Sequence, residues 1–158
     1  MVMEGKNIRM AQFNAIMHCF GTKFGYYNPT DWKQARYVDP VMCLWGDIQD
    51  CAAAVLFAPD DKKAECIEKY GAVARKMVAL FETMLAHHNG KYIGGNNVTI
   101  ADFVLASWIS VHGMNSKSPF QSTNKDIFKD FPKFYAYGMN FIGEFPYIKE
   151  RMATLGPF

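Results

Sequence analysis

The fold of this chain is decided by one stretch, Tyr92-Ile-Gly-Gly-Asn-Asn-Val-Thr-Ile-Ala-Asp-Phe-Val-Leu-Ala-Ser-Trp108. Within it, Thr99 and Asp102 have the spacing of the N-cap residue and the N3 residue of an α-helix. The Thr99 hydroxyl can accept the backbone N–H of Asp102, and the Asp102 carboxylate can accept the N–H of Thr99, which together make a capping box. A carboxylate at this position also complements the positive end of the helix dipole. The stretch therefore predicts a helix that begins directly after Thr99.

The residues around this box are apolar. Val98 before the cap and Phe103 after it have the spacing of a hydrophobic staple, in which the two side chains pack together and fix the entry of the chain into the helix. The residues from Ile100 to Ile109 are almost all apolar, whereas a helix on the surface of a protein would carry one polar face. We therefore expect this helix to lie at the centre of the fold.

The composition is that of a folded soluble domain without a nucleic-acid surface. The chain has 158 residues, of which 50% are hydrophobic and 15% aromatic, which is enough for one domain with a sizeable core. Its 17 basic and 15 acidic residues give a net charge of +2. No run of basic residues is present, so the sequence predicts no nucleic-acid partner.

Neither a membrane segment nor a secretion signal is indicated. The first ten residues lack the apolar core of a signal peptide, and we find no apolar stretch of about 18 residues that could span a bilayer. We expect an intracellular protein, most simply a cytoplasmic one, with an organelle or a large assembly also open.

The cysteines indicate neither a disulfide framework nor a metal centre. Cys19, Cys43, Cys51 and Cys66 include no C-x-x-C pair and have no spacing typical of metal ligands. Reduced thiols are the ordinary state in an intracellular protein. The sequence therefore predicts no metal site.

Apolar residues recur at steps of three and four over most of the chain, which predicts helices around the central one. Residues 1–10 read as a turn and a short extended piece. Pro40 lacks a backbone N–H and crowds the preceding turn, so we expect a kink or break near Val38 in the first long helix. We expect residues 113–123 to be irregular. The predicted helices cover residues 11–24, 31–57, 62–88, 100–111, 126–131, 133–141 and 146–154. The fold class is therefore all-α, a bundle of five to six helices.

Several segments resemble glutathione transferases. The stretch around Thr99 resembles the G-x-x-(L/V)-T-x-A-D-(F/I/L) signature of their C-terminal domain. Lys133-Phe-Tyr-Ala-Tyr, which follows Pro132, and Glu144-Phe-Pro-Tyr-Ile-Lys resemble the segment that closes this domain. Residues 35–50 resemble its first helix in the alpha, mu, pi and sigma branch. Gln12-Phe-Asn-Ala-Ile16 resembles the Q-S-x-A-I phrase that opens the last helix of the thioredoxin-like domain.

The resemblance implies two parts of unequal size. Residues 28–158 correspond to the C-terminal helical domain, and residues 1–27 correspond to a remnant of the thioredoxin-like domain, a short strand plus a helix. In the family, the thioredoxin-like half carries the catalytic Tyr, Ser or Cys and most of the glutathione contacts. The resemblance implies that this chain lacks most of that half, and it identifies no catalytic residue.

Two residues match positions that bind glutathione in the family. Gln12 matches the glutamine of the Q-S pair, and Asp47 matches the acid that reaches the γ-glutamyl amine across the dimer interface. They are candidate remnants of a glutathione site, or else a surface amide and a solvated helix carboxylate. Phe13 stands where the family has the serine that binds the γ-glutamyl carboxylate. Phe57 falls where the branch often has an aromatic residue facing the second substrate, although we favour a place in the core.

These considerations favour a non-catalytic glutathione-transferase-like protein that serves as a structural or protein-interaction module, with a protein partner or as a homodimer and without a cofactor. The alternative is a glutathione transferase whose glutathione site is degenerate or is supplied separately. The chemistry requires a hydroxyl or thiol beside the glutathione sulfur, and the resemblance places none there.

Overall fold

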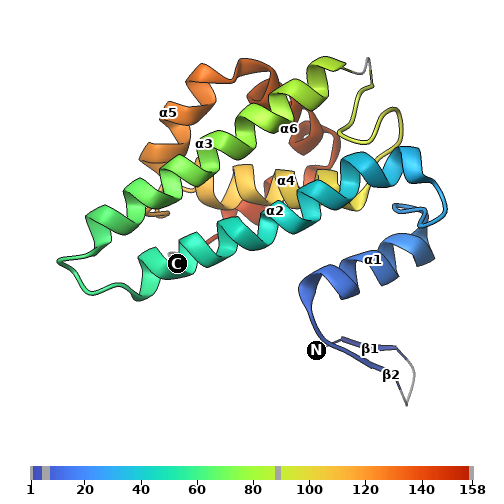
Figure 1. Ribbon diagram of the computed structural model, residues 1–158, viewed down its shortest axis with the longest axis horizontal. Coiled ribbons are helices and arrows are strands. Elements are labelled where there is room, and N and C mark those ends of the chain that lie inside the picture. Colours follow the sequence, from blue (N-terminus) through green and yellow to red (C-terminus); the bar gives the residue numbers. More distant parts are fainter. Residues whose placement is uncertain (1, 5–7, 88–89, 157–158) are drawn as a thin grey trace.

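The computed structural model describes residues 2–4, 8–87 and 90–156, and these form a helical bundle preceded by a small hairpin and a helix (Figure 1). In chain order the elements are β1 (Val2–Glu4), β2 (Ile8–Met10), α1 (Phe13–Phe24), α2 (Trp32–Phe57), α3 (Lys63–His87), α4 (Ile100–Trp108), the π-helical segment η1 (Ile109–Met114), α5 (Gln121–Asp130), α6 (Pro132–Glu144) and α7 (Pro146–Ala153). The predicted all-α bundle is confirmed. One short strand was expected within residues 1–10, and the structure has two. The predicted turn falls on residues 5–7, and the predicted end of the second long helix falls on His88, all outside the described residues.

Helices α2 and α3 form the long antiparallel pair on which the bundle is built (Figure 1). The Asp31 carboxylate caps α2 by accepting the N–H groups of Lys33 at 3.0 Å and Gln34 at 3.2 Å. Each helix turns one apolar face inward, where Ile48 of α2 and Val78 of α3 are completely buried. This amphipathic pattern is what holds a helix against a bundle core.

The break expected near Val38 does not occur, because α2 runs without interruption from Trp32 to Phe57, and the alternative of a kink there stays a prediction. A proline inside a helix removes one backbone hydrogen bond and strains the preceding turn. Here Val38, Val41 and Met42 on either side of Pro40 are at most 1% exposed, and burial of these side chains offsets the loss.

No apolar stretch of bilayer length was expected from the sequence, whereas by length and composition alone α2 is long and apolar enough to cross a membrane, and no other helix among the described residues is. Such a helix can equally be a core helix of a water-soluble bundle. In this structure its buried residues pack with α3 and α4.

Helix α4 lies at the centre of the fold, as its apolar sequence predicts. Ala101 and Trp108 are among its seven buried residues. The helix does not simply end near residue 111 but continues as η1 to Met114. The irregular segment is shorter than expected, because α5 begins at Gln121 rather than at Asp126.

The N-terminal elements lie at the edge of this bundle. Strands β1 and β2 pair antiparallel, with Val2 opposite Met10. Helix α1 lies beneath α2 and α4, and the hairpin lies on its far side, away from the bundle (Figure 1). Only Gly21 of α1 is fully buried, where an added Cβ would lie 2.6 Å from a methyl group of Ile100. This close approach requires glycine and fixes α1 against the start of α4.

Candidate functional site

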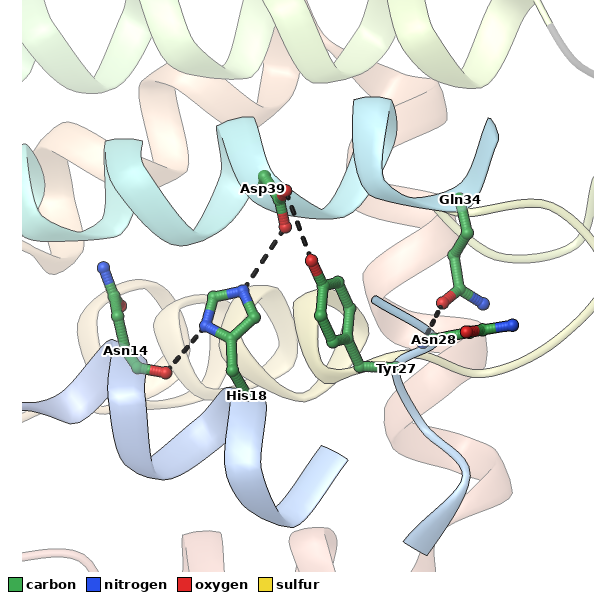
Figure 2. Close-up of polar contacts among 6 residues, drawn as sticks. All are labelled: Asn14, His18, Tyr27, Asn28, Gln34 and Asp39. Carbon is green, nitrogen blue, oxygen red and sulfur yellow. Dashed lines mark hydrogen bonds and ion pairs between the residues drawn. The ribbon is translucent and has the colours of Figure 1, made fainter. Parts of the chain in front are cut away.

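A polar cluster joins α1 to α2 at the junction between the N-terminal elements and the bundle (Figure 2). The Nδ1 atom of His18 lies 2.7 Å from the carbonyl oxygen of Asn14, and its Nε2 atom lies 3.3 Å from one carboxylate oxygen of Asp39. Tyr27, in the loop after α1, donates its hydroxyl to the other oxygen of Asp39 at 3.3 Å. The rings of His18 and Tyr27 meet edge to face, 4.6 Å apart.

The geometry of this cluster links α1 and the loop after it to α2. Both ring nitrogens of His18 face acceptors of the protein itself, the Asn14 carbonyl and the Asp39 carboxylate, and the tautomer decides which of the two accepts a hydrogen bond from a neutral imidazole. A histidine that acts as a general base needs one nitrogen directed at a substrate. Burial, followed by the hydrogen bond and the charge of Asp39, raises the pKa of Tyr27, which keeps its hydroxyl a donor.

Removal of this link should loosen α1. We expect Asp39→Ala to speed amide hydrogen exchange in α1 about fivefold, which corresponds to about 1 kcal/mol for the lost hydrogen bonds of a half-exposed carboxylate. Exchange measured by NMR checks this, with Asp50→Ala on the exposed side of α2 as the matched control. Equal α1 exchange rates in the two variants would show that the link does not hold the helix.

The candidate glutathione residues Gln12 and Phe13 stand at the N-terminus of α1. Gln12 is the N-cap, with φ 72° and ψ 123°, and its side chain makes no capping hydrogen bond. Among the described residues it alone has a positive φ without being a glycine, and such backbone strain often accompanies functional sites. Phe13 is 47% exposed, and its ring centroid lies 6.3 Å from that of Trp45 in α2.

Asp47 lies on the exposed surface of α2. It is two residues beyond Trp45, and two residues turn an α-helix by about 200°, so the Asp47 and Trp45 side chains leave opposite sides of α2. No hydrogen bond or ion pair between Asp47 and Gln12 occurs within the part of the chain that the structure describes. In the family resemblance this acid acts across a dimer interface, so contact with Gln12 of the same chain is not required, and the assignment of both residues to glutathione stays a prediction.

Phe57 is not a core residue, which corrects our favoured interpretation. It is 87% exposed at the last position of α2.

Thr99 and Asp102 meet at the start of α4 and form the capping box. The Asp102 carboxylate accepts the Thr99 N–H and the Thr99 hydroxyl, each at 2.7 Å. It also accepts the backbone N–H of Ile93 at 2.9 Å and the hydroxyl of Tyr137 from α6. Burial raises the pKa of the Asp102 carboxyl, and these four donors oppose that rise. Val98 and Phe103 both pack against the core, half-buried, and their staple contact stays a prediction.

A second buried polar network, which the sequence did not reveal, centres on the Tyr70 hydroxyl of α3. This oxygen accepts hydrogen bonds from Trp108 Nε1 and from Asn124 Nδ2, both at 2.9 Å, and lies 3.3 Å from His112 Nδ1. Burial raises the pKa of Tyr70 to about 12 and lowers the pKa of His112 to about 4. Both groups are therefore neutral near pH 7, and the network joins three helical segments to α3 without a buried charge.

No metal centre is indicated for the residues that the structure describes, since they hold no cluster of three or more His, Cys, Asp or Glu side chains suited to an ion. The four cysteines are free thiols, and Cys43 is exposed on α2.

The chain matches the model of the glutathione S-transferase C-terminal domain over residues 46–152. No curated protein sequence matches it. Among solved structures, the glutathione S-transferase Blo t 8 aligns with a TM-score of 0.78 and 19% identity over 96% of this chain and 66% of its own. The glutathione transferase YghU from Streptococcus pneumoniae, solved in complex with glutathione, aligns with a TM-score of 0.65 and 20% identity over 96% of this chain and 57% of its own.

The chain thus spans less than two thirds of the length of either solved structure, and identities this low establish the fold alone. The match to the family model extends over more than half of the chain. The protein therefore belongs to the glutathione S-transferase C-terminal domain family.

Proposed function

We propose that this chain acts as a non-catalytic glutathione-transferase-like module that associates with another protein or with a second copy of itself. The observation that carries the proposal is Phe13 at the first position of α1. In the family resemblance a serine hydroxyl at this position binds the γ-glutamyl carboxylate. A phenyl ring offers no hydrogen-bond donor to an anion, so the start of α1 loses a contact that would orient glutathione.

Exposed aromatic side chains near α1 support association. The exposed fractions are 47% for Phe13, 61% for Phe24, 38% for Tyr26 and 66% for Trp32. Single exposed apolar residues are common, but aromatic side chains are also what protein interfaces favour, and here four are exposed on α1, on the loop after it and at the start of α2. Met17 and Tyr27, in contrast, pack against the core and attach this segment to the bundle.

The chain alone is expected neither to bind glutathione at about millimolar concentration nor to conjugate it to 1-chloro-2,4-dinitrobenzene. Isothermal calorimetry and a spectrophotometric conjugation assay check the two parts. Gln12→Ala serves as the matched variant, because Gln12 is the residue that the family would use. Saturable binding with a micromolar dissociation constant, lost in Gln12→Ala, would overturn the non-catalytic proposal.

The alternative, a glutathione transferase with a separately supplied glutathione site, is favoured by one observation. Gln12 and Asp47 both lie on the surface and are accessible to a second protein. Under this alternative, glutathione would bind only when that second protein is present.

Association should be visible in solution. We expect light scattering after size exclusion to give a mass above the 18.0 kDa of one chain, or a chain that binds a hydrophobic dye and aggregates unless a partner is added. The double variant Phe24→Lys, Trp32→Glu should shift the protein to a monomer with less bound dye. A wild-type species of 18.0 kDa that stays soluble and binds no dye would contradict association.

A further inference from the structure

A groove with an apolar floor lies between η1, α5 and α6. Its volume is about 680 Å³, compared with about 200 and 150 Å³ for two other hollows beside Tyr92 and Tyr147. Helices α5 and α6 lie on the side of the bundle away from α1, so the groove is separate from the aromatic residues discussed above (Figure 1).

Met114, Phe128 and Tyr135 line the groove with apolar surface, and of these Phe128 is buried whereas Tyr135 is exposed at the edge. The rings of Phe128 and Tyr135 stack with centroids 5.5 Å apart and an interplanar angle of 24°. A Cβ atom at Gly113 would lie 2.5 Å from the ring of Phe128, so only glycine allows the ring to pack directly on the backbone of η1. Short π-helical segments such as η1 occur frequently at functional sites. The floor is thus a packed apolar surface with little freedom to collapse.

The rim carries a positive charge. Lys125 and Lys129 line it from consecutive turns of α5, and Asp126 lines it between them. Asp126 pairs with Lys129 at 2.7 Å, and the neighbouring Asp130 pairs with Arg75 of α3. Within these two ion pairs the positive and negative charges cancel. Lys125 has no ion pair within the described ranges of the chain, so its positive charge is not balanced by a neighbouring carboxylate.

The openness of the groove favours a protein segment over a free small molecule. Ser122, Lys125, Lys129 and Tyr135 are all exposed along its edge. Pockets for small ligands usually bury 70–90% of the ligand surface, which an open groove does not. A side chain carried by a larger partner would be covered by the partner itself.

We infer that this groove binds an acidic segment of a partner protein, which inserts an aromatic or aliphatic side chain onto Phe128 and Tyr135 and places a carboxylate beside Lys125. This inference rests on the proposed function only in that the chain binds other proteins. The partner segment would carry both acidic and apolar side chains. In such interfaces buried apolar side chains contribute most of the binding free energy, and charged side chains lie at the polar rim.

The test uses short synthetic peptides and two-dimensional NMR of the isotope-labelled chain. The probe has a leucine–phenylalanine pair between glutamates, and its counterpart has lysine at each glutamate. We expect the acidic peptide to shift amide signals of η1, α5 and the start of α6, with saturation near millimolar peptide, and the basic peptide to leave them unchanged. Lys125→Glu should weaken the acidic peptide at least tenfold, and Ser122→Trp, which fills the groove, should abolish its binding.

Lys33→Glu is the matched control, because Lys33 is exposed in the first turn of α2, and that end of α2 lies far from α5 (Figure 1); peptide binding by this variant should equal that of the wild type. Absent shifts, shifts on other elements, or equal binding of the basic peptide would overturn the inference. Benzoate alone binding at the same amides as tightly as the peptide would also overturn it, in favour of a small-ligand site. Glutathione binding would refute the non-catalytic proposal but would not move these signals, so the two failures are distinguishable.

Discussion

Asp102→Ala is expected to lower the free energy of unfolding by about 3 kcal/mol. The Asp102 carboxylate is 0% exposed and accepts four hydrogen bonds, from the Thr99 N–H and hydroxyl, the Ile93 N–H and the Tyr137 hydroxyl. Alanine leaves these buried donors without an acceptor, and each unsatisfied buried group costs roughly 1–3 kcal/mol. Water that enters the vacated space would recover part of this cost.

Chemical denaturation at pH 7 measures the effect. Thr99→Ala should cost only about 1 kcal/mol, because it removes one capping contact and leaves the carboxylate in place. Asp47→Ala, an exposed carboxylate on α2, is the control and should change stability by less than about 0.5 kcal/mol. If Asp102→Ala had a denaturation midpoint as high as that of Thr99→Ala, the hydrogen bonds from Ile93 and Tyr137 to Asp102 would not contribute to stability.

The difference between these two variants marks the limit of the sequence. Thr99 and Asp102 are three residues apart, and their pairing follows from helix geometry alone. Tyr137 is 35 residues from Asp102 and meets it only because α6 packs on α4. Helical periodicity in the sequence does not tell which hydroxyl of one helix donates a hydrogen bond to a buried carboxylate of another. The start of the central helix was therefore predictable, and the depth of its hydrogen-bond network was not.

The same distinction explains the errors in the helix assignments. Pro40 was expected to kink or break α2 because local backbone chemistry disfavours proline in a helix, yet the helix is unbroken, and the burial of Val38, Val41 and Met42 offsets the lost hydrogen bond. The π-helical geometry of η1 has no residue preference that a periodic pattern would reveal, although it places Gly113 against Phe128.

The candidate site was predictable only where the family resemblance reached. Gln12, Phe13 and Asp47 were identified by matching a motif, and their roles in binding remain predictions. His18 and Asp39 are 21 residues apart, and nothing in the sequence pairs them before α1 folds against α2. The link in Figure 2 is therefore a product of tertiary structure, as is the Tyr70 network.

His112 is expected to make the protein less stable as the pH falls from 7.5 to 5. It is 3% exposed, and its burial lowers its pKa from 6.5 to about 4. Between these two pKa values the unfolded chain binds a proton at His112 and the folded chain does not, so acid favours unfolding. The contribution is fully present above about pH 6.5 and is lost progressively as the pH falls towards 4. Over the measured interval this amounts to about 2 kcal/mol.

Unfolding by urea at a series of pH values checks this expectation against two variants. In His112→Gln the contacts with Phe120 and Tyr70 change, so the variant should be less stable than the wild type at pH 7.5. Because glutamine does not titrate, the free energy of unfolding of this variant should fall by about 2 kcal/mol less than that of the wild type between pH 7.5 and 5. His87→Gln, at an exposed position near the end of α3, should keep the full dependence of the wild type. Carboxylates common to all three proteins contribute equally and cancel when the slopes are compared. If the free energy of unfolding changed with pH equally in the wild type and in His112→Gln, His112 would be solvated in the folded protein, and water would reach the Tyr70 network.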